Sequence, residues 1–486
     1  MTYSDLCPRV AGWLFTVAVA AAACNGRSTI GEQPGHGGTG GTATAGKPGG
    51  GGTTGVAGYV LDGFGGNVFT GSGGTAGTMG SAGTNAGAGT SGLAGITGEA
   101  GAMSVNPCNS GAAGGVGGGM VGTRRFLSPV EYVTRLGAYL VALGDLNGDS
   151  RPDIAVQNRD TPGRGGTDGG NAGTDGRGPG FFGSVSVFLS RAGGGFAEPT
   201  HYTRGEPFGL AIGDVNGDGK PDVAVKKWAG VDVLVNNGDG SLAAPLSIAS
   251  DAGTYGVSIA DLNADGRADI VMPQEGHLDA NNVLVDGAVQ VLFNMGPALF
   301  VAASFPAGAN AAALAIGDLN GDGRPDLPVA SGSGVSVLLN NGNGTFAAPA
   351  SFGAGTYPSS MAIGDLNGDG KADLAVASQG GVSVLLNLGN GSFAAAINYS
   401  AAMRAVVIGD LSGDGKPDLV GVAPETCSGI AVLVNAGDGT FGVTPVAIGN
   451  GVAARSLALG DVNGDGRLDV VAPTFEGVAV ILSETP

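Results

Sequence analysis

The sequence has few basic residues: 22 Lys and Arg stand against 41 Asp and Glu among 486 residues, so the formal net charge is −19. Nucleic-acid binding needs a basic surface that neutralises phosphates, and this balance argues against it. No apolar run reaches the 18 residues of a membrane span. Glycine is abundant, at 98 residues, but it does not recur at every third position, which excludes collagen.

Enzyme signatures are also scarce. The sequence has only three His, and neither H-E-x-x-H nor G-x-S-x-G occurs. A carboxylate pair for glycoside hydrolysis could come from Glu275, Asp279 and Asp286, but no spacing singles these residues out. The sequence therefore favours a non-catalytic protein without deciding the question.

The N-terminal residues predict export. Val10–Ala23 is an apolar stretch after Arg9, with the length of a signal-peptide core. It ends in Ala-Ala-Ala before Cys24, which resembles a bacterial lipobox. We therefore expect residues 1–23 to be a signal peptide and Cys24 to carry lipid, which would place the protein in the outer membrane or at the cell surface. The usual Leu is missing three positions before the cysteine, so cleavage without lipidation, giving a secreted protein, is the alternative.

Residues 24–121 are predicted to be a flexible tether. They repeat Gly, Thr, Ala and Ser loosely, as in GTAGTMGSAGTNAGAGTSG, and contain few large apolar side chains. Such a segment cannot bury enough surface to offset its chain entropy. Cys108 and Cys427 are the two cysteines left after export and lipidation. They either form a disulfide or stay as two free thiols.

The remaining residues, 122–486, contain an internal repeat. The block D-x-N-x-D-G-x-x-D occurs seven times, with variations, at intervals of 45 to 69 residues. In the fifth repeat, short strands are predicted at 360–364, 374–378, 382–387 and 394–400, with turns between them. Four strands at this period are typical of a propeller blade. The sequence therefore predicts an all-β, seven-bladed β-propeller.

The two ends of this region predict how the ring closes. The last repeat stops after GVAVILSETP and lacks a fourth strand, whereas Phe126–Tyr132 precedes the first repeat without a partner. We expect this N-terminal strand to be the outer strand of the last blade, whose inner strands lie at 456–483. Such pairing would hide the edges that an open ring exposes.

The repeats IGDLNGDGRPDLPVAS, VSVLLNNGNGTFAAP and IGDLNGDGKADLAVAS resemble the FG-GAP/VCBS repeats of integrin-α-like β-propellers. The resemblance covers all seven repeats. It implies that the loops between the first and second strands share one face of the ring. The loops between the second and third strands, and those between blades, would then share the opposite face, on which a partner is expected.

The repeated block also predicts metal binding. Counted from its first residue, it places Asp at positions 1, 5 and 9 and Asn or Ser at position 3, and these hard oxygen donors favour Ca²⁺. Up to seven Ca²⁺ ions are expected, one per blade. The alternative is that the blocks are only Asn/Asp/Gly turns. The predicted ligands are Asp145, Asn147, Asp149, Asp153, Asp214, Asn216, Asp218, Asp222, Asp261, Asn263, Asp265, Asp269, Asp318, Asn320, Asp322, Asp326, Asp365, Asn367, Asp369, Asp373, Asp410, Ser412, Asp414, Asp418, Asp461, Asn463, Asp465 and Asp469.

Three of the repeats depart from the pattern. Ser150 replaces Gly at position 6, which predicts a strained turn and the weakest site. Ser412 is a shorter ligand than Asn at position 3. Ala264, at position 4, is expected to be harmless.

Several features are candidates for partner binding, each with a structural alternative. Residues 157–183 and 273–288 enlarge two loops of the expected partner face, or are neutral surface insertions. Aromatic residues just before four of the motifs predict a ring that stacks on a ligand, or packing between blades. Lys226–Trp228 adds a positive turn that we expect to be solvated. The four aromatic residues are Tyr139, Phe208, Tyr255 and Tyr357.

Together these features predict a calcium-binding, non-catalytic module for ligand binding or adhesion. We expect a monomer whose partner is an extracellular protein or a glycan, and which contacts the membrane only through a lipid anchor. A carbohydrate-active propeller, either a polysaccharide lyase or a lectin, is the alternative. A passive spacer without a ligand is a third hypothesis.

Overall fold

The computed structural model describes residues 120–134, 137–159, 183–192, 194–205, 207–228, 230–250, 256–278, 284–285, 287–332, 334–423, 429–442, 446–449 and 454–484. Every regular element within these ranges is a β-strand, in agreement with an all-β fold. None of them forms a helix with the length and apolarity of a membrane span. The predicted signal peptide, residues 24–119 of the predicted tether and the three cysteines Cys24, Cys108 and Cys427 lie outside the described residues, whereas Met120 and Val121, the last two residues of the predicted tether, form a strand.

Seven sheets have four antiparallel strands each, and three of them come from the first half of the β region. The first contains β4 (Gly137–Gly144), β5 (Asp153–Arg159), β6 (Gly183–Phe188) and β7 (Thr200–Gly205). The second contains β8 (Pro207–Gly213), β9 (Asp222–Lys227), β10 (Gly230–Leu234) and β11 (Leu246–Ala249). The third contains β12 (Ser258–Ala260), β13 (Asp269–Gln274), β16 (Ala288–Asn294) and β17 (Phe300–Pro306).

The other four-stranded sheets follow along the chain. One contains β18 (Ala311–Leu314), β19 (Leu327–Ser331), β20 (Gly334–Leu338) and β21 (Ala350–Gly353). The next contains β22 (Pro358–Gly364), β23 (Asp373–Ser378), β24 (Gly381–Leu385) and β27 (Ile397–Tyr399). It is followed by β28 (Val406–Gly409), β29 (Asp418–Val422), β30 (Ile430–Leu433) and β31 (Val446–Ile448). The last contains β32 (Ala458–Gly460), β33 (Asp469–Pro473), β34 (Gly477–Ile481) and β3 (Val130–Val133).

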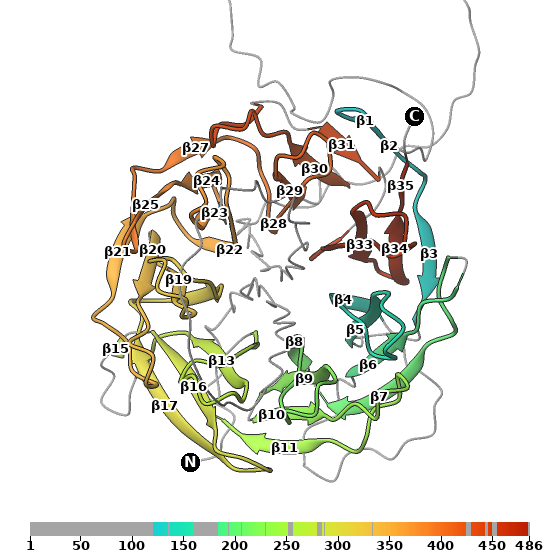
Figure 1. The fold of residues 1–486 in the computed structure, drawn as a ribbon, viewed down its shortest axis with the longest axis horizontal. Coiled ribbons are helices and arrows are strands. Elements are labelled where there is room, and N and C mark those ends of the chain that lie inside the picture. The colour runs from blue at the N-terminus through green and yellow to red at the C-terminus, as the bar shows by residue number, and fades with distance from the viewer. Residues whose placement is uncertain are drawn as a thin grey trace, which may run out of the picture. The chain divides into compact units, whose positions relative to one another are not determined.

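The innermost strands of these sheets surround a common axis, which makes the fold a β-propeller (Figure 1). A glycine at the end of most innermost strands allows the close approach of the next sheet. A Cβ atom on Gly144 would lie 2.8 Å from Cγ2 of Ile212, and one on Gly460 would lie 2.8 Å from Cδ1 of Leu143. The second contact joins the last repeat to the first, so the ring is closed.

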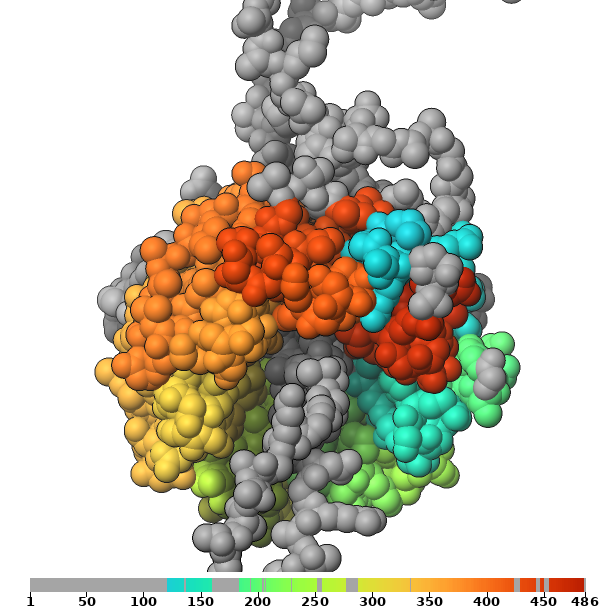
Figure 2. Space-filling view, turned by 45° about the horizontal axis from the view of Figure 1, so that its top comes forward, coloured from blue at the N-terminus to red at the C-terminus, as the bar shows by residue number. Residues whose placement is uncertain are grey.

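The predicted number of blades, seven, is wrong. The described residues form eight sheets of three or four strands, because β1 (Met120–Val121) and β2 (Arg124–Phe126) join β35 (Ser483–Glu484) in a separate three-stranded sheet. A turn at Gly122, whose φ is 54°, folds β1 back onto β2. Figure 2 shows these residues in cyan between the two sheets that lie nearest the C-terminus.

The predicted closing strand, Phe126–Tyr132, is divided between two sheets. Phe126 pairs with Ser483 in the three-stranded sheet, whereas Val130 pairs with Val480 of β34. Pro129 lies between the two strands and has no N–H to donate to a sheet, which favours the break at this point. The start of the β region therefore completes the sheet of the last repeat through β3, with different bounds from those expected.

Two further sheets have two strands each. β14 (His277–Leu278) pairs with β15 (Leu284–Val285) inside the second insertion, and β25 (Asn387–Gly389) pairs with β26 (Ser392–Phe393) in the fifth repeat. Both are local hairpins beside the larger sheets.

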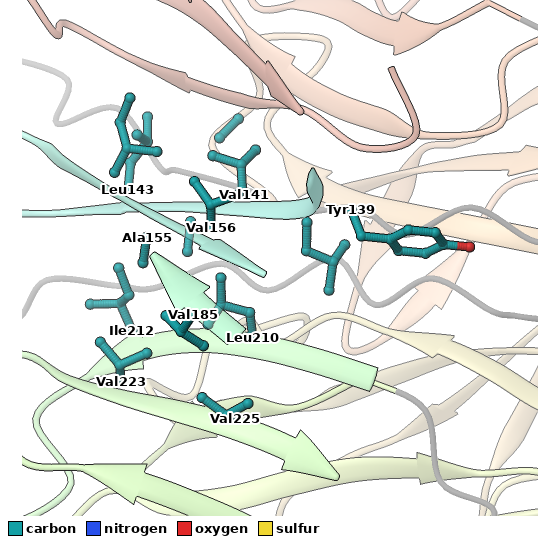
Figure 3. Packing of buried hydrophobic residues seen from close by; sticks show 14 of the residues in the cluster. Tyr139, Val141, Leu143, Ala155, Val156, Val185, Leu210, Ile212, Val223 and Val225 are labelled. Atoms are coloured by element: carbon teal, nitrogen blue, oxygen red, sulfur yellow. The ribbon is translucent and has the colours of Figure 1, made fainter. Parts of the chain in front are cut away.

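The core lies between neighbouring sheets. Side chains of β5 face those of β8, as Figure 3 shows for Ala155, Leu210 and Ile212, whereas Val141 and Val156 lie on the other face of their sheet. Val156 is fully buried as well, because each sheet is covered on its two faces by its two neighbours in the ring. This is why the strands are apolar on both faces and do not alternate with polar residues.

Candidate functional site

The aspartate blocks form the loops between the first and second strands of each four-stranded sheet. In the fourth repeat, the loop at 318–326 joins β18 to β19, which begins at Leu327. Neighbouring loops are linked, since Nδ2 of Asn340 in the fourth repeat donates to the carbonyl of Leu262 in the loop of the third. The predicted ligand residues of all seven blocks are therefore on one face of the ring.

The Asp at position 1 accepts hydrogen bonds from the loop backbone. Oδ1 of Asp318 accepts from the N–H of Gly321 at 2.7 Å, and Oδ2 accepts from the N–H of Gly323 at 2.8 Å. Both glycines have φ near 80°, in the left-handed region. Oδ1 of Asn320 accepts from the N–H of Asp322 at 2.9 Å. The first half of the block is therefore a tight turn around the first carboxylate.

The Asp at position 9 is fully buried and ties the loop to the sheet. Oδ2 of Asp326 accepts from the N–H of Leu319 at 2.9 Å, and Oδ1 accepts from the N–H of Asn340 at 2.7 Å. The sequence predicted this residue only as a ligand, and its role as a hydrogen-bond acceptor for two backbone segments was missed. The same burial holds for Asp153, Asp222, Asp269, Asp326, Asp373, Asp418 and Asp469.

Burial raises the pKa of these position-9 carboxyl groups. The pKa rises to about 6 for Asp269 and Asp326, and to about 7 for Asp469. Desolvation is the main cause, while the hydrogen bonds from the backbone act in the opposite direction. The nearby carboxylates at positions 1 and 5 raise the pKa further, as Asp261 and Asp265 do for Asp269. The three carboxylates of one loop therefore lie close enough to repel one another.

Position 7 is Lys or Arg in all seven loops, a feature that sequence reasoning overlooked although it is visible there. Each of these side chains forms an ion pair with the Asp at position 5. The Lys371–Asp369 and Arg467–Asp465 pairs measure 3.0 and 2.9 Å, respectively. The pairs are partly exposed, so each contributes little stability by itself, roughly 0–1 kcal/mol. Their effect is to reduce the negative charge of the loop.

The donor chemistry of the loops fits a hard divalent cation, because every side chain at positions 1, 3 and 5 offers oxygen and a cation would offset the repulsion between the carboxylates. Within the described residues, however, no three carboxylate, His or Cys side chains are grouped closely enough to hold a metal ion. The loops thus contain suitable ligands in a hydrogen-bonded arrangement in which each Asp also binds backbone N–H groups.

Comparison with family models finds FG-GAP-like repeats at residues 227–272, 318–376, 365–421 and 410–472. These segments contain the aspartate loops of five of the seven repeats. The chain carries FG-GAP-like repeats. Within these residues, the match confirms the resemblance of the sequence motifs to FG-GAP repeats. No curated protein matches the chain.

Several solved structures are similar to the propeller. One describes recognition of non-reducing terminal N-acetylglucosamine by an Agrocybe aegerita lectin, with 23% identity, a TM-score of 0.41, and 59% of this chain and 81% of that chain covered. BBS1N in complex with ARL6DN has 13% identity and a TM-score of 0.46, covering 76% and 98%. Virginiamycin B lyase from Staphylococcus aureus with quinupristin has 12% identity and a TM-score of 0.43, covering 73% and 98%. These likenesses are too distant to support an argument about function.

The FG-GAP-like loops that depart from the pattern are strained in two places. Ser150 adopts a φ of 67°, in agreement with the strain predicted for it. Ala264 adopts a φ of 60°, so the expectation that it is harmless is wrong: the corresponding residues are glycines, which adopt this conformation without steric cost. The shorter side chain of Ser412 still contacts the carboxylate at position 5 of its loop, since its Oγ donates to Oδ1 of Asp414 at 2.9 Å.

The opposite face carries the predicted aromatic residues at the starts of innermost strands. Tyr139 and Phe208 are buried, which supports the packing alternative for these two. Tyr357 is 51% exposed, and Tyr255 lies outside the described residues. The described residues thus do not form a continuous exposed aromatic ring.

The turn at Lys226–Trp228 differs from the solvated turn that was expected. Lys226 is fully buried, and its Nζ donates to the carbonyl of Gly230 at 3.4 Å and to Oγ of Ser250 at 3.2 Å. Lys227 forms an ion pair of 2.7 Å with Asp232. Only Trp228 is exposed, at 45%.

The two insertions are described only in part. Residues 160–182 of the first lie outside the described residues, as do Asp279 and Asp286 of the second. In the second insertion, Oε1 of Glu275 is buried without a hydrogen-bond partner, and burial raises the pKa of this carboxyl group to about 7. A pairing of Glu275 with Asp279 or Asp286 stays a prediction.

Proposed function

We propose that this protein is a non-catalytic, calcium-binding β-propeller that presents a ligand-binding or adhesion surface. The observation that carries the proposal is the repetition of one oxygen-rich loop seven times on one face of the ring. That face is occupied by loops with a common hydrogen-bonding pattern, which leaves the opposite face, with its longer loops, for a partner.

Calcium is supported by electrostatics. Each loop brings three carboxylates together, and the raised pKa of Asp269 is partly caused by its neighbours Asp261 and Asp265. A divalent cation would replace this repulsion by attraction. For a dissociation constant near 10⁻⁴ M, 1 mM Ca²⁺ would stabilise the protein by roughly 1.4 kcal/mol for each filled site.

Location at the cell surface is also part of the proposal. The apolar residues 10–23 and Cys24 would direct export and lipid attachment, and the Gly-rich residues 24–121 would hold the propeller away from the membrane. The proposed protein is a monomer whose partner is an extracellular protein or a glycan.

Native mass spectrometry with and without 1 mM Ca²⁺ tests the metal proposal by counting the bound ions. We expect up to seven ions, one fewer in Asp322→Asn, and an unchanged number in the control Asp239→Asn, which changes an exposed turn outside the blocks. Addition of a chelator is expected to lower the melting temperature by about 10 °C if most sites are filled. A protein that binds no Ca²⁺ and melts at the same temperature with chelator would contradict the proposal.

A further inference from the structure

An arginine is held between two aromatic rings on the face opposite the aspartate loops. Cζ of Arg159 lies 5.0 Å from the ring centroid of Tyr139 and 5.2 Å from that of Phe208. The strand directions fix this location. β4 begins near Tyr139 and runs toward the aspartate loop, β5 returns from the loop and ends at Arg159, and β8 begins near Phe208.

Arg159 is half-buried, and the structure gives its guanidinium no hydrogen bond or ion pair with any residue that it describes. Tyr139 also contacts Arg455, whose Cζ lies 5.0 Å from the same ring and whose Nη1 donates to the tyrosine Oη at 3.2 Å. Two guanidinium groups therefore share one aromatic ring. The two rings restrict the position of the Arg159 guanidinium, and its N–H donors have no hydrogen-bond partner among the described residues.

A stacked guanidinium suits the recognition of a carboxylate. Arginine stays charged at all physiological pH values and presents its donors in a planar fork that matches a carboxylate with two parallel hydrogen bonds. Because the rings already orient Arg159, little side-chain entropy is lost when such a ligand binds.

An exposed aromatic surface lies next to this cation. The Trp228 ring centroid is 5.9 Å from that of Phe208, with an angle of 59° between the planes, and Trp228 is 45% exposed. The neighbouring Lys227 is neutralised by Asp232. Among the described residues, the local pattern is therefore two guanidinium groups beside one flat apolar surface, and one of them, Arg455, already donates to the Tyr139 hydroxyl.

We propose that Arg159 and Trp228 form a subsite for a glycan that carries a single uronic acid. Arg159 would bind the sugar carboxylate and Trp228 would stack on the adjacent sugar ring. An acidic peptide or a polyanionic chain fits less well, because it would need more cations than these two arginines, and the protein as a whole carries a net charge of −19. This inference rests on the proposed function as a ligand-binding module and specifies its ligand.

Calorimetric titration with two trisaccharides tests the inference. One ends in glucuronic acid, and the other is its neutral glucose-ended counterpart. We expect the wild-type protein to bind the acidic sugar at least about tenfold more tightly than the neutral one, the contribution of a charge-assisted hydrogen-bond pair. The Arg159→Gln variant should lose this preference, and the Trp228→Ala variant should bind both sugars more weakly. The control Arg191→Gln changes an exposed residue in the turn after β6, outside the aspartate blocks, and should change neither affinity.

Three results would overturn the inference: equal affinity for the two sugars, no binding of either, or an acid preference that survives in Arg159→Gln. Binding of an Asp/Glu peptide that depends on Arg159, without sugar binding, would also overturn it. Trp228 is exposed, so Trp228→Ala gives a test that does not depend on the stability of the stacked arginine. Counting bound Ca²⁺ in the same samples separates the two proposals, because a protein that binds Ca²⁺ but no sugar contradicts only the glycan subsite.

Discussion

The side-chain amide of Asn340 donates a hydrogen bond of 2.9 Å to the carbonyl of Leu262, which belongs to the aspartate loop of the preceding repeat. The same amide donates to the carbonyl of Pro325, and the backbone N–H of Asn340 donates to the buried Asp326. One residue therefore connects its own loop, its own sheet and the neighbouring sheet. Equivalent bonds between repeats are made by Asn236, Asn294, Asn387 and Asn435.

Replacing Asn340 by Ala should destabilise the propeller by about 2–3 kcal/mol. The change leaves the buried carbonyl of Leu262 and the partly buried carbonyl of Pro325 and N–H of Gly342 without these partners, and unsatisfied buried groups are costly. Urea denaturation measures the loss. The neighbouring Asn341 is exposed, so Asn341→Ala should stay within about 0.5 kcal/mol of the wild type. Equal losses in the two variants would show that the link between repeats does not stabilise the ring.

The loops of the first and fourth repeats provide a matched test of backbone strain. Ser150 and Gly323 occupy the same position, with φ values of 67° and 80°, and both are exposed. Ser150→Gly should stabilise the protein by about 1 kcal/mol, because glycine adopts the left-handed conformation without a steric cost. Gly323→Ser should destabilise the protein by a similar amount. Backbone strain would be the cause, because no atom lies within 4 Å of the added Cβ and a steric clash is therefore absent. Thermal melting of both variants should show shifts of opposite sign, and shifts of the same sign would exclude strain as the cause.

Much of the fold could be predicted from the sequence because its repeat is long and regular. The four-strand period, the loop positions and the pairing of the chain ends all follow from spacing. The eighth sheet could not be predicted, because β1 and β2 have two and three residues and show no periodicity. Met120 and Val121 also directly follow a Gly-rich segment, and two apolar residues alone do not indicate a strand.

The candidate site was only partly predictable for a different reason. The motif locates Asp318, Asn320, Asp322 and Asp326 in one loop, but it does not distinguish their environments. Asp326 is fully buried with backbone partners, whereas the other three are at least partly exposed. This difference depends on the packing of β20 and of the neighbouring repeat over the loop, contacts that are remote in sequence.

The raised pKa of Glu275 leads us to expect that the stability of the protein depends on pH. The pKa of Glu275 is raised by burial from 4.5 to about 7, so between these pH values the folded protein retains a proton that the unfolded chain has released. Stability contributed by the neutral form is therefore complete below about pH 4.5 and is lost as the pH rises through 7. Allowing for partial solvent screening, the loss is about 1–2 kcal/mol.

The measurement compares the melting temperature of the wild type with that of Glu275→Gln at pH 5 and pH 8, at constant Ca²⁺ concentration. We expect the variant to be relatively more stable at pH 8, because Gln carries no charge to desolvate. The exposed Glu131→Gln serves as a control and should follow the wild type. Parallel pH profiles for Glu275→Gln and the wild type would contradict the prediction.

The burial of Phe126 allows a prediction of how much the three-stranded sheet contributes to the stability of the propeller. The Phe126 side chain is fully buried in the same apolar cluster as Val407 and Leu411, and its backbone pairs with Ser483. This pairing corresponds to the Asn340–Phe346 bridge within the fourth repeat, but here it joins the two ends of the β region. Phe126→Ala should destabilise the protein by about 3–4 kcal/mol, the usual cost of a large core cavity.

The control lies on the strand that follows. Val133 is 66% exposed, so Val133→Ala should change stability by less than about 0.5 kcal/mol. The urea midpoints of the two variants, measured with the concentration of soluble protein after heating, separate loss of the core contact from a general intolerance of this segment. Midpoints that fall equally would show that burial of Phe126 is not what holds the two ends of the β region together. A large fall for Phe126→Ala alone would show that burial of this side chain stabilises the closed ring, since Phe126 packs in one apolar cluster with Val407 and Ile481.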